Sequence, residues 1–68
     1  PKDDPQLSRK QRKELQALLA DGGHYKGEVS GRVGRKTKAA IVSYQQMAGL
    51  PPDGYPSRKL LERLRRNR

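Results

Sequence analysis

Cysteine, tryptophan and phenylalanine are absent from this 68-residue chain, and histidine occurs once. Without cysteine there is no disulfide framework and no Cys/His zinc site, so neither of the usual supports of small domains is available. No apolar run approaches the roughly 20 residues that a membrane-spanning helix requires, and no apolar signal region follows the N-terminus. We therefore expect one small domain, without a membrane span, that is held together by helix packing.

Catalytic groups are also scarce. A nucleophile, a base and an orienting partner must converge in a cleft, yet the single histidine, His24, lies in a glycine-rich segment where we expect it to be solvent-exposed. A glycosidase would need paired carboxylates. The available ones are scattered over predicted turns and surfaces: Asp21, Glu28, Asp53 and Glu62. The sequence therefore predicts a non-catalytic domain with no metal and no cofactor.

Positive charge dominates the composition. The net charge is +9, from 16 Lys and Arg against 7 Asp and Glu. Such an excess favours an anionic partner: nucleic acid, an acidic lipid surface or a cell-wall polymer. Four of the cations crowd the C-terminus, where we interpret them as a solvated tail: Arg63, Arg65, Arg66 and Arg68.

The chain begins at Pro1 without an initiator methionine, so we expect it to be a piece of a longer protein. Its first residues hold two prolines and no apolar periodicity, which is typical of a leader or linker. The sequence divides into a leader at 1–6, a folded domain at 7–65 and a basic tail at 66–68.

A first helix is predicted over residues 9–20. Ser8 followed by Gln11 matches a capping box, and Leu15, Leu18 and Leu19 form one apolar stripe. The polar residues of this helix are expected to face water, Arg12 and Glu14 among them. Asp21-Gly22-Gly23 ends it.

Residues 22–34 contain five glycines and predict a long glycine-rich loop. We expect Gly27, Gly31 and Gly34 to supply positive φ angles or close backbone approach. Val29 and Val33 are expected to hold the loop against the core. A short hairpin in this segment remains an open alternative.

A second helix is predicted over residues 35–48, as the central helix of the core. Its apolar positions repeat with the helical period: Ala40, Ile41, Tyr44, Met47 and Ala48. Gly49 is placed as a left-handed cap with Leu50 folding back, and Pro51-Pro52 prevents continuation.

Ser57 is placed to cap a third helix whose inward residues are Leu60, Leu61 and Leu64. The predicted fold class is all-α, a compact three-helix bundle. A weak internal echo is present, because Ser30-Gly31 and Asp53-Gly54 each precede a helix. Whether these are two copies of one unit or two ordinary turns is left open at this point.

A series of short motifs occurs in a fixed order from the first helix to the third. They are Leu15-Gln16, Leu19, Gly27, Ser30-Gly31, Gly34, Thr37, Ala40-Ile41, Tyr44-Gln45, Gly49-Leu50 and Asp53-Gly54. In order and spacing, over about residues 12–64, they resemble the peptidoglycan-binding domain of the type 1, three-helix kind. The ending Asp53-Gly54-Tyr55-Pro56-Ser57 is similar to the C-terminal module of lytic murein transglycosylases of the membrane-bound B type. The chain departs from the family where Ser30-Gly31 replaces the usual Asp-Gly.

The resemblance implies a non-catalytic, monomeric module that binds peptidoglycan through its glycan strand or its stem peptide. It also implies that the module holds an attached wall-remodelling enzyme, such as a lytic transglycosylase, on the murein of a bacterial cell envelope, periplasmic or extracellular. If so, Arg32, Arg35 or Lys36 could meet stem-peptide carboxylates, and Tyr25 and Tyr55 could stack on a sugar or a peptide group. Gln45 and Asp53 are the more polar members of the family pattern, with loop architecture as their alternative role.

Two other classes of function are weighed against this one. A helix-turn-helix DNA reader would place basic residues where Arg35, Lys36 and Lys38 stand. It would, however, need a connection of three or four residues in place of the about fourteen found here. Nucleic acid is therefore disfavoured as a partner. The second alternative is a prodomain or interaction module without a polymer ligand.

Overall fold

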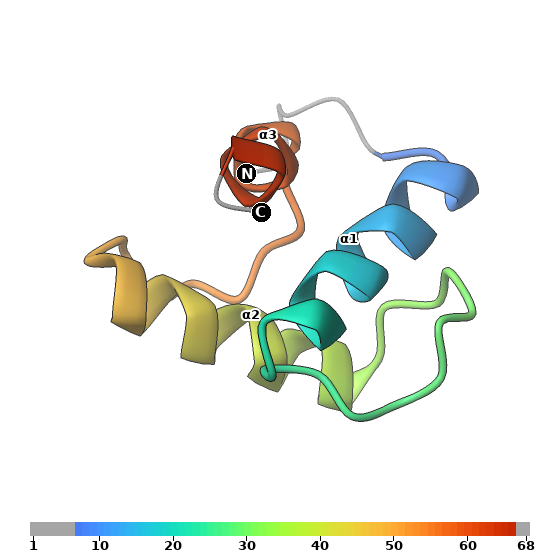
Figure 1. Ribbon diagram of the computed structural model, residues 1–68, viewed down its shortest axis with the longest axis horizontal. Coiled ribbons are helices and arrows are strands. Elements are labelled where there is room, and N and C mark those ends of the chain that lie inside the picture. Colours follow the sequence, from blue (N-terminus) through green and yellow to red (C-terminus); the bar gives the residue numbers. More distant parts are fainter. Residues whose placement is uncertain (1–6, 67–68) are drawn as a thin grey trace.

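The computed structural model of this chain describes residues 7–66, and its three helices form an all-α fold, as predicted. They are α1 (Arg9–Asp21), α2 (Arg35–Ala48) and α3 (Arg58–Arg66). In Figure 1, α3 is seen almost end-on above α2, with α1 to the right of both. No strand forms within residues 7–66, so the alternative of a hairpin was wrong.

Helix α1 is the centre of the arrangement. It packs against both other helices, whereas the backbones of α2 and α3 stay apart within the described part of the chain. The expectation that the second helix would be central was therefore wrong. The innermost side chains come from all three helices, with Leu15 and Leu19 on α1, Ile41 on α2 and Leu61 on α3 each less than 2% exposed.

The predicted caps at Ser8, Gly49 and Ser57 are confirmed. The Ser8 Oγ accepts from the Gln11 N–H, and the Gln11 side chain accepts from the Ser8 N–H, which completes the capping box. Gly49 ends α2 in the left-handed region with φ 75°, and the N–H of Leu50 donates back to the Gln45 carbonyl. Ser57 Oγ accepts from the Leu60 N–H at 3.1 Å and caps α3.

A buried glutamine on α1 fastens the connection between α1 and α2. Gln16 is 0% exposed, and its Oε1 accepts from the Gly31 N–H at 2.8 Å. Its Nε2 donates to the Arg32 carbonyl at 2.8 Å and to the Thr37 Oγ1 at 3.0 Å. One side-chain amide thus joins three segments, and both of its N–H donors and one acceptor lone pair are used.

A second glutamine repeats this arrangement one helix later. The Oε1 of Gln45 accepts from the Gly54 N–H, and its Nε2 donates to the Asp53 Oδ1, both at 2.9 Å. Gly31 and Gly54 both adopt positive φ angles, 86° and 69°.

The residue before each of these glycines forms the same local turn. Ser30 Oγ accepts from the Arg32 N–H at 3.2 Å, and Asp53 Oδ1 accepts from the Tyr55 N–H at 2.9 Å. The internal echo of the sequence is therefore a structural repeat: a helical glutamine fastened to a Ser-Gly or Asp-Gly turn. In this repeat the side chains of Gln45 and Asp53 hold the turn that precedes α3.

Two side chains expected to face water instead join segments of the fold. Arg12 is half-buried and donates through Nε to the Gly31 carbonyl at 2.6 Å and through Nη1 to the Leu7 carbonyl at 2.7 Å. Glu14 accepts two hydrogen bonds of 2.7 Å from the Arg65 guanidinium. The contact between Glu14 and Arg65 joins α3 to α1, so Arg65 does not belong to a solvated tail.

Other details of the sequence-based expectation were wrong. Gly34 has φ −105° and open space around it, so it supplies neither a positive φ nor a close approach, whereas a Cβ on Gly27 would lie 2.6 Å from the Tyr25 Oη. Val29 is 41% exposed and does not hold the loop against the core. Helix α3 continues to Arg66, and residues 67–68 and 1–6, with Arg68 and the expected leader, lie outside the described residues.

Replacing Gly31 by alanine tests the close approach of its turn to α1. A Cβ there would lie 2.8 Å from the Arg9 Cγ and 3.2 Å from the Arg9 carbonyl oxygen, whereas a Cβ on Gly23, at φ 82°, meets nothing within 4 Å. We expect Gly23→Ala to cost about 1–2 kcal/mol of stability, from its left-handed backbone alone. Gly31→Ala should cost about 1–3 kcal/mol more from overpacking. Urea unfolding followed by circular dichroism measures both, and equal losses would contradict the close approach.

The pH dependence of stability tests the Asp53 turn. Hydrogen bonds from the Tyr55 N–H and then from the Gln45 side chain hold the pKa of Asp53 below its ordinary value of 3.8. Because the folded-state pKa is the lower one, this carboxylate adds stability above about pH 4, which is lost as the pH falls through the folded-state pKa. Asp53→Asn should lack this acid-dependent part. Carboxyl NMR titration and urea unfolding between about pH 2 and pH 6 provide the measurement, and an ordinary pKa for Asp53 would refute the turn geometry.

Candidate functional site

A groove lies between α2 and α3, whose backbones are not in contact within the described residues. It has a volume of about 630 Å³ and lies between the second half of α2 and the end of α3, with the last turn of α1 closing one side. Its apolar lining includes Leu18, Tyr44, Met47 and Leu64. Because α1 packs against both of the other helices while they stay apart, the groove follows directly from the arrangement of the bundle.

Met47 was expected in the core and instead lies at the edge of this groove, 70% exposed. It stands three residues after Tyr44 on α2, so it continues the inward face of that helix, but α3 does not cover it. The deeper lining is buried, with Leu18, Tyr44 and Leu64 between 3% and 7% exposed. A flexible methionine beside a buried apolar floor is a surface that can adapt to a ligand.

His24 forms one wall of the groove and is held in place, contrary to the expected exposed loop position. Its Nδ1 lies 3.2 Å from the Ser43 Oγ, and its ring meets that of Tyr44 edge-on at a centroid distance of 5.7 Å and an angle of 84°. A Cβ on Gly22 would lie 3.0 Å from the His24 Cδ2, so the glycine leaves room for the ring. The imidazole is thus a half-buried, oriented group.

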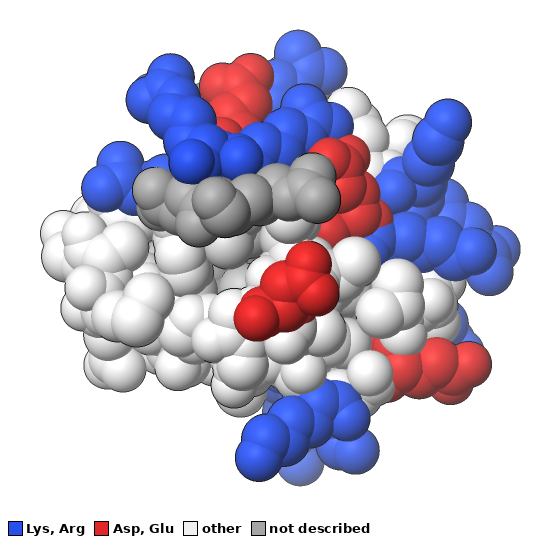
Figure 2. Space-filling view, viewed as in Figure 1, with Lys and Arg blue, Asp and Glu red and all other residues white. Residues whose placement is uncertain are grey.

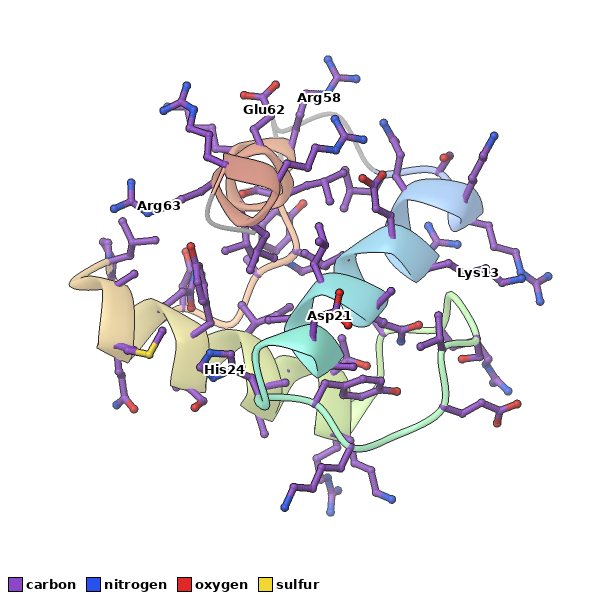
Figure 3. The ribbon with its side chains drawn as sticks, in the orientation of Figure 1. Lys13, Asp21, His24, Arg58, Glu62 and Arg63 are labelled. Atoms are coloured by element: carbon purple, nitrogen blue, oxygen red, sulfur yellow. The ribbon has the colours of Figure 1, made fainter. Side chains whose placement is uncertain are left out.

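Two opposite charges border the groove. Asp21 is exposed on the last residue of α1, and Arg63 is exposed on α3. Figure 3 shows Asp21 near the middle of the view, His24 below it and to the left, and Arg63 pointing to the left from α3. Within residues 7–66 neither side chain has a salt bridge. Both charges are therefore available to a ligand.

The positive charge of the domain surrounds this face without covering it. Figure 2 shows Lys and Arg side chains gathered at the top, at the right and at the bottom of the view. Uncharged side chains fill the middle and the left, with an acidic side chain at the centre, where Figure 3 labels Asp21. The described side chains at the middle of this view are therefore mainly uncharged.

The residues predicted from the sequence to contact a ligand do not form one common site. Arg32 and Tyr55 share a second hollow of about 350 Å³, and Lys36 lines a hollow of about 290 Å³ beside His24. Gln45 and Asp53 lie in another hollow, of about 330 Å³.

The other two predicted residues lie apart from these hollows in different ways. Arg35 is exposed at the first position of α2. Tyr25 belongs to the core with 7% exposure, and its Oη donates to the Glu28 carbonyl at 2.6 Å. Its buried ring offers little surface for stacking.

Sequence reasoning missed the groove because it gave each of its exposed residues another role. Asp21 was assigned to a helix stop, Met47 to the core and Arg63 to a basic tail. One signal was available. The predicted apolar stripe of the second helix has five positions and continues to the last turn, at Met47 and Ala48, whereas the stripe of the third helix has three positions.

The described residues show neither a metal site nor a membrane segment. Residues 7–66 contain no group of three or more His, Asp or Glu side chains arranged to hold a metal ion. In the same part of the chain, no helix has the length and apolar character needed to cross a membrane.

Known proteins are similar to this chain over nearly its whole length. The family model described as "Putative peptidoglycan binding domain" matches residues 8–64. The crystal structure of SltB3 from Pseudomonas aeruginosa in complex with NAG-anhNAM-pentapeptide matches 96% of this chain at 52% identity and a TM-score of 0.89. A second structure of SltB3, in complex with NAG-NAM-pentapeptide, matches 94% at 53% identity and a TM-score of 0.88.

In both cases the chain spans 17% of the length of SltB3. A comparison with curated protein sequences gives no match. The family match covers α1, α2, most of α3 and both glutamine-fastened turns. The chain therefore belongs to the family of peptidoglycan-binding domains.

Proposed function

We propose that this domain is a non-catalytic module that binds peptidoglycan and keeps an attached wall-remodelling enzyme on murein. The observation that carries the proposal is the match to SltB3, in which a chain of this fold and 52% identity forms 17% of a larger protein. That protein was crystallised with a disaccharide bearing a pentapeptide. The proposed location is the bacterial cell envelope, and the proposed oligomeric state is a monomer.

The benefit of such a module is local concentration. When one domain is bound to the polymer, an enzyme on the same chain meets its substrate as an intramolecular event, so even a modest affinity raises the encounter rate. A net charge of +9 adds long-range attraction to an anionic wall. That part of the attraction weakens as salt screens it.

Arg32, Arg35 and Lys36 have a supporting role in this proposal. All three are exposed, and their positions on the loop and on the first turn of α2 suit contacts with carboxylates of the wall polymer. Tyr55, half-exposed beside Arg32, is the one predicted aromatic with surface left for stacking. These contacts steer the domain to the wall, whereas the groove is the concave site.

Co-sedimentation with insoluble peptidoglycan sacculi tests the proposed function. We expect the domain to sediment with sacculi at low salt and, in smaller amount, at about 150 mM salt, because the groove contacts persist when surface charges are screened. The triple variant Arg32→Gln, Arg35→Gln, Lys36→Gln should lose part of the low-salt binding only.

Titration with duplex DNA over the same salt series is the matching control. A nucleic-acid-binding domain would show an affinity that falls steeply with salt and no sedimentation with sacculi. That pair of results would overturn the proposed function. A prodomain would give neither signal.

A further inference from the structure

The groove presents two opposite charges across an apolar floor. Asp21 stands at the end of α1 and Arg63 on α3, and Leu18, Tyr44 and Leu64 line the same groove. The Asp21 carboxylate can accept hydrogen bonds from an ammonium group, and the Arg63 guanidinium can donate to a carboxylate. A complementary ligand therefore carries both charges, separated by a small apolar segment.

A polyanion does not fit this face. The groove has a carboxylate at the centre of the view in Figure 2, and the clusters of Lys and Arg lie around it. An acidic polymer would be repelled by Asp21 and drawn to the surrounding cations. Nucleic acid and other polyphosphates are therefore disfavoured as occupants of the groove.

The glycan strand does not match the floor either. Sugar rings are held by exposed aromatic faces and by many polar groups, but Tyr44 is 3% exposed and has the His24 ring packed edge-on against it. The remaining floor is aliphatic. Small aliphatic side chains of a peptide suit such a floor, since they bury apolar surface without leaving hydroxyl groups unpaired.

From these features we infer that the groove binds the stem peptide of peptidoglycan, with Asp21 holding a free ammonium group and Arg63 a free carboxylate. The inference rests on the proposed function and adds to it the part of the polymer that is recognised. Uncrosslinked stem peptides present both charges and small side chains, whereas in a crosslink one stem loses its ammonium group and the other its terminal carboxylate. The groove thus selects uncrosslinked stems. His24 and Met47 border the bound peptide.

NMR titration of the labelled domain compares two soluble probes. The first is a disaccharide with its stem peptide, including a diamino acid with a free ammonium group, and the second is the same disaccharide without the peptide. We expect the first probe to shift amide signals at 18–24, 43–48 and 60–64, and the second to leave them unchanged. Equal shifts with both probes, or shifts confined to Arg32 and Tyr55, would overturn the inference.

Single variants assign the two charges. Asp21→Asn and Arg63→Gln should each weaken binding of the peptide-bearing probe by about 2- to 5-fold, the usual range for exposed ion pairs. Glu28→Gln and Lys10→Gln make the same changes of charge at exposed positions away from the groove and should leave the affinity unchanged. Both groove side chains are exposed, so folding of the variants is expected to be intact and is checked by circular dichroism.

Modified probes complete the test. The wild type should bind the probe with an acetylated ammonium group as weakly as Asp21→Asn binds the unmodified probe. It should bind the probe with amidated carboxylates as weakly as Arg63→Gln binds the unmodified probe. If each variant loses the same factor with modified and unmodified probes, the charge assignment is wrong. Sedimentation with sacculi separates failure of the stem-peptide site from failure of the proposed function. If the domain binds sacculi but the peptide probe does not shift the amide signals of the groove, only the stem-peptide site is refuted. If the domain does not bind sacculi, the proposed function is refuted.

Discussion

The buried amide of Gln16 is the interaction on which the rest of this domain depends. It lies at 0% exposure and joins the middle of α1 to the Gly31 turn and to the first turn of α2. A 68-residue chain has a small core, so a side chain that satisfies three backbone or side-chain groups at once fixes much of its geometry. Without that amide the Gly31 N–H would be left without its acceptor.

The same device used twice explains the arrangement of the helices. Gln16 positions α2 relative to α1, and Gln45 positions the turn that leads into α3. Helix α3 then returns to α1, where the Arg65 guanidinium meets Glu14. Since both α2 and α3 are placed against α1, nothing requires them to touch each other. The groove is the space that remains between α2 and α3, and its opposite charges come from Asp21 at the end of α1 and from Arg63 on α3.

Much of the fold could be predicted from the sequence, because the relevant signals are local. The capping box at Ser8, the left-handed cap at Gly49 and the periodic leucines each act within a few residues. The central role of α1 could not be predicted, since periodicity shows that a face is buried but not against which helix. The exposure of Met47 has the same cause.

The candidate site was harder to predict for a related reason. Basic, aromatic and polar residues in and near the loops were predicted to contact a ligand. Tyr25, however, packs in the core, and Gln45 and Asp53 form hydrogen bonds within a turn. The groove depends on a missing contact between α2 and α3, and its residues look ordinary one at a time. Asp21 and Arg63 lie far apart in the sequence, so only the folded chain shows them bordering one hollow.

The two glutamine-fastened turns also bear on how quickly the domain forms. Gln16 and Gly31 are 15 residues apart, and Gln45 and Gly54 are 9 apart, so each closes a short loop with little loss of chain entropy. The Glu14 to Arg65 contact spans 51 residues and requires α1 to be in place first. We expect the unit of α1 and α2 to assemble early and α3 to dock last. The wall of the groove that carries Arg63 is then the final element to take its position.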